Sequence, residues 1–169
     1  MFKKLLALRE RVLEMVKRVS WLGPLLARLT VGVVFVGTGW GKLHSLDDVT
    51  KYFGELHIPA PHFNAVLAAS AELFCGLALL LGVLTRLAAI PLITTMVVAI
   101  LTAKRQEIDG VSSLLGLEEF SYLTLFFWLA LAGPGTASLD HLLARILLKD
   151  KKAPYPKPLL QPNQPVARS

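Results

Sequence analysis

The chain contains four apolar segments, each long enough to cross a lipid bilayer as a helix. A bilayer core of roughly 30 Å takes about 20 helical residues to cross, and somewhat fewer where charged side chains at the segment ends extend to the interface. No segment shows the alternation of polar and apolar residues that is typical of a β-barrel strand. The expected fold is therefore all-α, a four-transmembrane-helix bundle within residues 21–149. The expected spans are Trp21–Leu43, Asn64–Leu84, Leu87–Ala103 and Phe120–Leu139.

The distribution of cationic residues predicts the orientation of these spans. Thirteen Lys and Arg residues lie before the first span, between the second and third spans, or after the fourth span, and these segments share one side of the membrane. Only four lie on the other side, near the two remaining connections, together with seven acidic residues. Because cytoplasmic loops carry an excess of Lys and Arg, both termini are expected in the cytoplasm. The net charge of +6 then reflects orientation in the membrane. No basic and aromatic pattern suggests base stacking, so no nucleic-acid partner is expected.

The two ends of the chain differ in composition from the spans. Residues 1–20 are expected to form a basic amphipathic helix, and such helices commonly lie in the headgroup region of a membrane. A surface anchor and a docking site for a cytoplasmic partner are both compatible with this interfacial helix. Residues 150–169 contain five prolines among polar residues and are expected to be a disordered cytoplasmic tail. Membrane lipids are thus the first expected partner.

Glu72 is the most informative residue of the second span, because a charged side chain at membrane depth is costly and usually faces the interior of a bundle. Ala68 and Gly76 lie one turn away on the same face, and small residues at this spacing favour close helix contact. Arg28, in the first span, differs from Glu72 in depth by about 8 Å, which an extended arginine could largely close. Three interpretations stay open: a structural Arg28–Glu72 ion pair, a functional pair in which Glu72 exchanges a proton, or an Arg28 that extends to the cytoplasmic interface.

The end of the first span, Gly37–Lys42, is a second candidate site. Trp40 and Lys42 could anchor the helix at the membrane interface. Alternatively they could form a pocket in which Trp40 stacks on a flat ring and Lys42 contacts an oxygen of that ring. Three histidines share the following loop, but their spacing matches no standard ligand set, so no metal site is expected.

A set of short motifs, in order along the chain, resembles the DoxX family of small four-helix bacterial inner-membrane proteins, from about Leu26 to Asp140. Each motif is weak alone, whereas the ordered set is more specific. Many relatives have a histidine just after the third span, where this chain has Lys104, and this departure argues against histidine-based chemistry there. The motifs are Arg28-x3-Gly32, Gly41-Lys-Leu43, Tyr52-Phe-Gly54, Ile58-Pro-x-Pro61, Glu72-Leu-x2-Gly76, Gly82-x2-Thr-Arg86 and Gly133-Pro-Gly-x2-Ser-Leu-Asp140.

This resemblance implies a location in the bacterial inner membrane and a link to quinone-dependent oxidoreduction or to thiol and oxidative-stress defence. The first hypothesis is a subunit of a quinone-linked membrane oxidoreductase, with a quinone pocket at Glu72, Arg28, Trp40 and Lys42 and with Glu72 and Arg28 as a proton-exchange pair. No residue offers a metal or electron-carrier site, so a partner redox protein would supply electrons. The second hypothesis is a non-enzymatic membrane scaffold or small-solute carrier with a structural Arg28–Glu72 pair. Homo-oligomerisation stays open in both.

Overall fold

A computed structural model describes residues 2–149, and in this range the chain is all-α, with no strand. The apolar runs form the longest helices, and the polar connections between them form short ones. The helices in chain order are α1 (Phe2–Val19), α2 (Leu22–His44), α3 (Leu46–Glu55), α4 (Pro61–Leu81), α5 (Thr85–Leu101), the 3-10 helix η1 (Arg105–Glu107), α6 (Val111–Gly116), α7 (Glu118–Ala132) and α8 (Leu139–Lys149).

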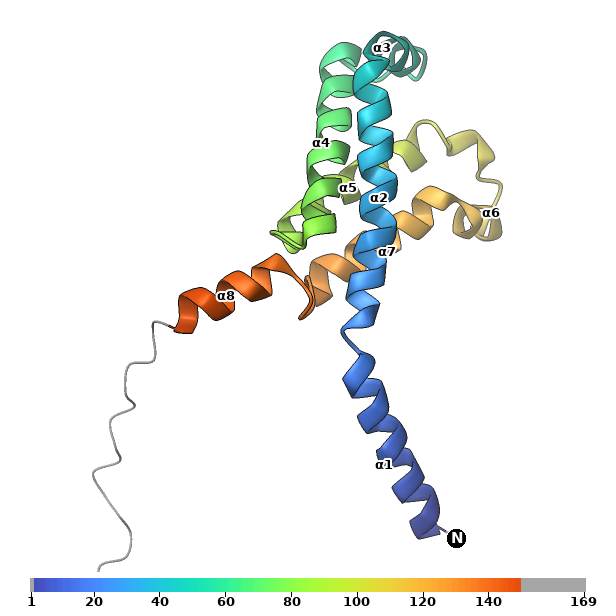
Figure 1. Ribbon diagram of the computed structural model, residues 1–169. Coiled ribbons are helices and arrows are strands. Elements are labelled where there is room, and N and C mark those ends of the chain that lie inside the picture. Colours follow the sequence, from blue (N-terminus) through green and yellow to red (C-terminus); the bar gives the residue numbers. More distant parts are fainter. Residues whose placement is uncertain (1, 150–169) are drawn as a thin grey trace, which may run out of the picture.

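Helices α2, α4, α5 and α7 form the packed part of the fold (Figure 1). The most extensive contact joins α2 to α4, and the next joins α5 to α7. Phe35 of α2 and Phe126 of α7 link the two pairs, because their rings pack edge to face with centroids 4.8 Å apart. The centre of the core is formed by Val31, Phe35, Leu79, Ala89, Leu92, Phe126 and Leu129.

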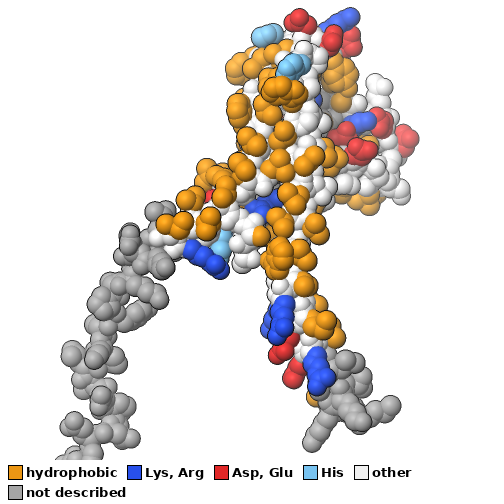
Figure 2. Space-filling model, in the orientation of Figure 1, with side chains coloured by type: hydrophobic (Ala, Val, Ile, Leu, Met, Phe, Trp, Pro, Cys, Tyr) orange, Lys and Arg blue, Asp and Glu red, His pale blue; other side chains and the backbone are white. Residues whose placement is uncertain are grey.

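The outer faces of these helices are apolar, as is the core between them. Figure 2 shows hydrophobic side chains along α2 and α4, while charged side chains gather mainly at the helix ends and in the loops. Two helical stretches, Arg9–His44 and Pro61–Leu81, are long and apolar enough to cross a membrane, and α5 is a shorter apolar helix. Large exposed apolar surfaces mark contacts with a membrane or with another protein. Surfaces of this kind on helices of this length are typical of a membrane protein.

Three of the four expected segments coincide with helices to within three residues, namely α2, α4 and α5. The C-terminal end of the fourth segment was predicted wrongly, because α7 ends at Ala132 and does not continue to Leu139. Gly133 and Gly135 adopt φ values of +81° and +74°, in the left-handed region that glycine enters at little cost. These two glycines and the proline between them turn the chain away before α8 begins.

Helix α1 confirms that residues near the N-terminus are helical. It extends away from the packed helices and roughly continues the direction of α2 (Figure 1), from which Ser20 and Trp21 separate it. Its position relative to a membrane surface stays a prediction. The proline-rich tail expected at residues 150–169 lies outside the described residues.

Glycine residues bring the backbones of α2 and α4 into direct contact. A Cβ atom at Gly39 would lie 2.4 Å from the backbone nitrogen of Leu73, and one at Gly76 would lie 2.9 Å from that of Val36. Small residues at helix contacts in membranes permit this close approach. Glu72 lies on the same face of α4 as Gly76 and is buried there. The prediction that Glu72 points into the bundle is therefore confirmed.

Gly39→Ala is expected to lower the midpoint of thermal unfolding in detergent, because the added Cβ meets the backbone of α4. Overpacking of this kind costs about 1–3 kcal/mol. Gly37→Ala and Gly41→Ala are matched controls on the same helix, since a Cβ at either position meets nothing within 4 Å. Fluorescence-detected size-exclusion chromatography of heated extracts compares the three variants. Equal midpoints for Gly39→Ala and Gly37→Ala would contradict a limiting role for this backbone contact.

Candidate functional site

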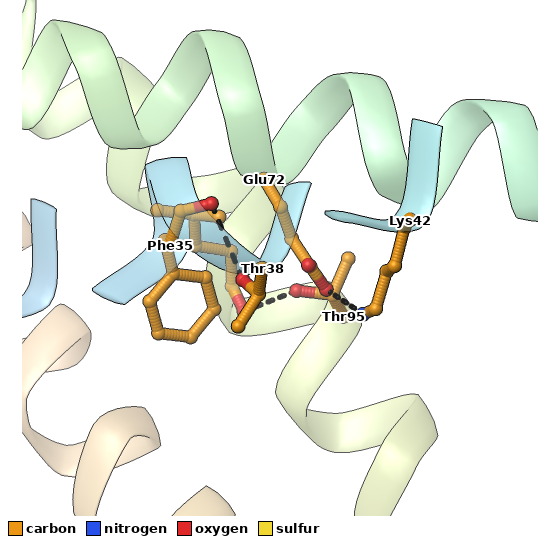
Figure 3. A network of polar contacts seen from close by, with 6 residues as sticks. Phe35, Thr38, Lys42, Glu72 and Thr95 are labelled. Carbon is orange, nitrogen blue, oxygen red and sulfur yellow. Dashed lines mark hydrogen bonds and ion pairs between the residues drawn. The ribbon is translucent and has the colours of Figure 1, made fainter. Parts of the chain in front are cut away.

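The partner of Glu72 is Lys42, at the C-terminal end of α2. The Lys42 Nζ atom donates a hydrogen bond to Glu72 Oε1 at 2.5 Å. Side chains in a helix lean toward the N-terminus of that helix. Because α2 and α4 are antiparallel, Lys42 leans inward along the bundle while Glu72 leans toward it, and the close-up in Figure 3 shows the two side chains pointing at each other. Glu72 is only 2% exposed, whereas the Lys42 side chain is 35% exposed.

Arg28 lies at the other end of the bundle, so the expected Arg28–Glu72 pair was predicted wrongly. The Arg28 guanidinium donates through Nη2 to the carbonyl oxygen of Ala137, and a Cβ placed on Gly82 would lie 1.8 Å from its Nη1. Arg28 is therefore level with Gly82. Gly82 follows Glu72 by ten residues, which separates the two by about 15 Å along the axis of α4. The side chain also leans toward the N-terminus of α2, which points it away from Glu72.

The Lys42–Glu72 pair lies in a cavity of about 210 Å³ between four helices. Glu72 is buried within it, while Glu118 is exposed and Glu119 half-buried where α7 begins, so the cavity opens near the start of α7. The lining residues are Val34, Phe35, Thr38 and Lys42 from α2, Glu72 from α4, Met96 from α5, and Glu118, Glu119 and Tyr122 from α7.

Trp40 does not line this cavity. It is 58% exposed, and its ring lies against that of His44 with centroids 4.4 Å apart. Residues two apart on a helix point to different faces, and the glycine-rich end of α2 stays helical through Lys42. Lys42 therefore faces the bundle while Trp40 faces outward. Of the four predicted site residues, the structure brings together Lys42 and Glu72 and separates both from Arg28 and Trp40.

The buried end of the cavity offers both a hydrogen-bond donor and an acceptor. Among the described residues, Glu72 Oε2 has no hydrogen-bond partner although it is buried. Lys42 carries three N–H groups, one of which is used by Oε1. The nearby hydroxyl of Thr38 donates to the carbonyl of Phe35 in its own helix (Figure 3). A ligand with a carbonyl or hydroxyl oxygen could satisfy the remaining groups of the pair.

The contribution of α7 to the cavity was not predicted from the sequence. Glu118 and Glu119 are among the seven acidic residues expected opposite the Lys- and Arg-rich side of the membrane, and neither they nor Tyr122 were candidates for the site. Tyr122 packs edge to face on Phe35, with ring centroids 5.3 Å apart. No local sequence pattern marks these α7 residues as neighbours of Glu72, because α7 follows Glu72 by more than forty residues.

Lys104 lies outside the apolar helices and close to Glu119. A hydrogen bond to Glu107 and the nearby carboxylate of Glu119 raise the pKa of Lys104.

A second polar cluster joins the motif residues at the opposite end of the bundle. The backbone nitrogen of Asp140 donates to the carbonyl of Gly82 at 3.2 Å, and Asp140 Oδ1 accepts from the backbone nitrogen of Leu84 at 3.1 Å. Arg28 reaches into the same region through Ala137. Three motifs that are far apart in sequence therefore meet around one turn. Among the residues described, no group of three or more His, Cys, Asp or Glu residues could hold a metal ion.

Long apolar helices with exposed hydrophobic faces and a buried Lys–Glu pair between them define an integral membrane protein with a polar site inside its bundle. The chain belongs to the DoxX family, whose sequence profile matches residues 23–105. An uncharacterized membrane protein of Mycobacterium tuberculosis, Rv3486, is 37% identical over 130 residues, which are 70% of this chain and 79% of that protein. The inner membrane protein YqjF of Escherichia coli is 32% identical over 130 residues, 75% of this chain and 96% of that protein.

A further relative carries a functional name. The putative oxidoreductase CatD of Bacillus subtilis is 31% identical over 121 residues, which are 70% of this chain and 85% of that protein. No solved structure gives a significant match to the chain.

Proposed function

We propose that this protein is a multi-pass subunit of a quinone-linked oxidoreductase in the bacterial inner membrane, and that the cavity at Lys42 and Glu72 binds the ring of the quinone. In this proposal α2, α4, α5 and α7 cross the bilayer and both termini are cytoplasmic. The exposed apolar faces and the excess of Lys and Arg on one side support this placement. The relative YqjF is named an inner membrane protein, and the relative CatD is named a putative oxidoreductase.

The size of the cavity favours a ligand with a single ring. A cavity of about 150 Å³ lined by apolar side chains holds benzene, whereas drug-sized ligands occupy pockets of about 300–1,000 Å³. The cavity here has about 210 Å³. Phe35, Met96 and Tyr122 provide apolar and aromatic walls. A quinone ring fits these dimensions, while its isoprenoid tail would extend between the helices into lipid.

The observation that carries the proposal is the unpaired oxygen of Glu72 beside an ammonium group with free donors. Lys42 donates to a ring carbonyl and orients it, and Glu72 Oε2 accepts from the hydroxyl of the reduced ring. Reduction of a quinone to a quinol takes two electrons and two protons. Both protons would come from water at the cavity mouth near Glu118 and Glu119, and one of them would be relayed through the Glu72 carboxylate to the adjacent ring oxygen. A partner redox protein delivers the two electrons.

Quinone retention tests the proposal. Protein purified from membranes in mild detergent is extracted with organic solvent, and the quinone is quantified per mole of protein by liquid chromatography. Close to one quinone per protein is expected for the wild type. Thr38→Leu is expected to lose most of it, because the longer side chain fills the cavity that Thr38 lines. Trp40→Leu is the matched control from the same helix, since Trp40 faces outward, and it is expected to retain quinone.

Equal quinone contents in Thr38→Leu and Trp40→Leu, at equal amounts of folded protein, would mean that the quinone comes from co-purified lipid. That result would contradict the cavity as its site. A wild type without quinone would contradict the proposal as well.

A non-enzymatic scaffold or small-solute carrier is the second candidate function. One observation favours it: the Lys42–Glu72 pair lies beside the glycine contact of α2 and α4, where an ion pair would hold the two helices in register. The structural pair of this hypothesis is therefore Lys42–Glu72, since the Arg28–Glu72 pair is not formed. The two functions differ in what happens when both charges are removed together.

A further inference from the structure

Helix α8 carries an apolar stripe that is exposed in the described part of the chain. The stripe residues recur with the spacing expected for one face of a helix. They are 39 to 60% exposed. The other faces of the helix carry Asp140, His141 and Arg145. The stripe consists of Leu139, Leu142, Leu143 and Ile146.

The direction of α8 is held by contacts with the bundle. The backbone nitrogen and the carboxylate of Asp140 both bond to the turn between α4 and α5, at Gly82 and Leu84. Arg28 binds the carbonyl of Ala137 just before the helix, and Ser138 Oγ accepts from the backbone nitrogen of His141 at 3.1 Å. Figure 1 shows α8 running sideways from the lower end of α4, at a steep angle to α2 and α4. The helix therefore leaves the bundle in a defined direction.

The apolar stripe lies next to other exposed apolar side chains at this end of the bundle. The large side chains around the α4–α5 turn, Leu81, Leu84 and Leu87, are exposed on the outside of the bundle. In Figure 2 hydrophobic side chains lie at this end of the bundle and along α8, and a Lys or Arg side chain lies at the lower edge of the helix. A helix with an apolar face and a basic edge, parallel to the membrane plane, is typical of an interfacial helix.

We propose that α8 lies in the headgroup region of the cytoplasmic leaflet, with Leu142 and Ile146 at the acyl-chain boundary and Arg145 beside anionic lipid phosphates. The lipid surface is favoured over a second copy of the chain because the stripe adjoins exposed apolar side chains at the end of the bundle, which face lipid in the placement proposed above. Arg145 matches the negative charge of anionic lipids. The proposal needs the chain to cross the bilayer but is independent of quinone binding.

Spin labels on single cysteines test the depth of α8. Cys75 is the only cysteine of the chain, so Cys75→Ala provides a background into which Leu142→Cys, Ile146→Cys or Arg145→Cys is introduced. The labelled full chain is reconstituted into phosphatidylcholine vesicles with and without phosphatidylglycerol. Labels at 142 and 146 are expected to collide with oxygen, which dissolves in lipid, and to lose contact with a water-soluble nickel chelate. The label at 145 is expected to show the reverse.

Equal contact of all three labels with the nickel chelate would overturn the proposal, because α8 would then be solvated. Protection of 142 and 146 from both reagents would overturn it too, since a second copy of the chain would then cover the stripe. A second variant probes the charge: in the Ile146→Cys protein, Arg145→Gln is expected to increase contact with nickel in vesicles that contain phosphatidylglycerol. Arg105→Gln, at the other end of the bundle, is the control and is expected to change nothing.

Discussion

Gly82→Ala is expected to leave little folded protein in the membrane. Gly82 adopts a φ of +68°, and a residue with a side chain in the left-handed region costs about 1–2 kcal/mol. The added Cβ would also lie 1.8 Å from Arg28 Nη1 and 2.8 Å from Ser138 Cβ. Arg28 would have to leave its place beside Ala137, and an uncompensated buried charge costs about 3–5 kcal/mol. Together these losses reach the lower end of the stability of a typical domain, which is about 5–15 kcal/mol.

Two further glycine variants make this prediction quantitative. Gly133 also has a positive φ, of +81°, but its nearest neighbour is the Arg86 side chain, with Nε 3.0 Å from an added Cβ. An exposed arginine can move, so Gly133→Ala is expected to give an intermediate loss. Gly23→Ala meets nothing within 4 Å and is expected to behave as the wild type. Membrane abundance and the thermal midpoint in detergent measure the series, and a Gly82→Ala protein as stable as Gly23→Ala would contradict the packing of Arg28.

The helices and the inward position of Glu72 could be predicted from the sequence because both depend on local properties. Uninterrupted apolar runs specify helices whose ends lie within a few residues of the charges that bound them. Small residues on the face of Glu72 favour a close helix contact, and of these Gly76 is buried against α2 while Ala68 is half-buried. The break after Ala132 was also visible in the sequence, as two glycines that flank a proline. The turn at these glycines ends the helix although the apolar residues continue beyond it.

The partner of Glu72 could not be predicted, because it depends on the register of α2 against α4. The expected depths of Arg28 and Glu72 rest on the assumption that the cytoplasmic ends of the first and second spans lie at the same level in the membrane. The contact of Gly39 with Leu73 instead sets Glu72 near the level of Gly39 and leaves Arg28 opposite Gly82. The lean of helical side chains toward the N-terminus then separates Arg28 from Glu72 further. The same orientation of helical side chains brings Lys42 close to Glu72.

The final prediction separates the two proposed functions by removing the charges of Lys42 and Glu72 singly and together. Lys42→Met is expected to destabilise the protein by about 3–5 kcal/mol, because it leaves a buried carboxylate without its partner. Glu72→Gln is expected to cost less, since the partly exposed Lys42 can turn to solvent. The double variant Lys42→Met with Glu72→Leu is expected to regain most of the stability, as apolar replacements of buried ion pairs often do. Thermal midpoints in detergent measure all three proteins.

The exposed pair Lys104–Glu107, in which Nζ lies 2.9 Å from Oε1, is the matched control for these variants. Exposed pairs contribute about 0–1 kcal/mol, so Lys104→Met with Glu107→Leu is expected to change neither stability nor quinone content. If Lys42 and Glu72 bind quinone, the apolar double variant is folded but loses the quinone found in the wild type. If the pair only holds α2 and α4 in register, the double variant keeps both its fold and every property of the wild type. A folded double variant with full quinone content would therefore reject the redox proposal and leave the scaffold function.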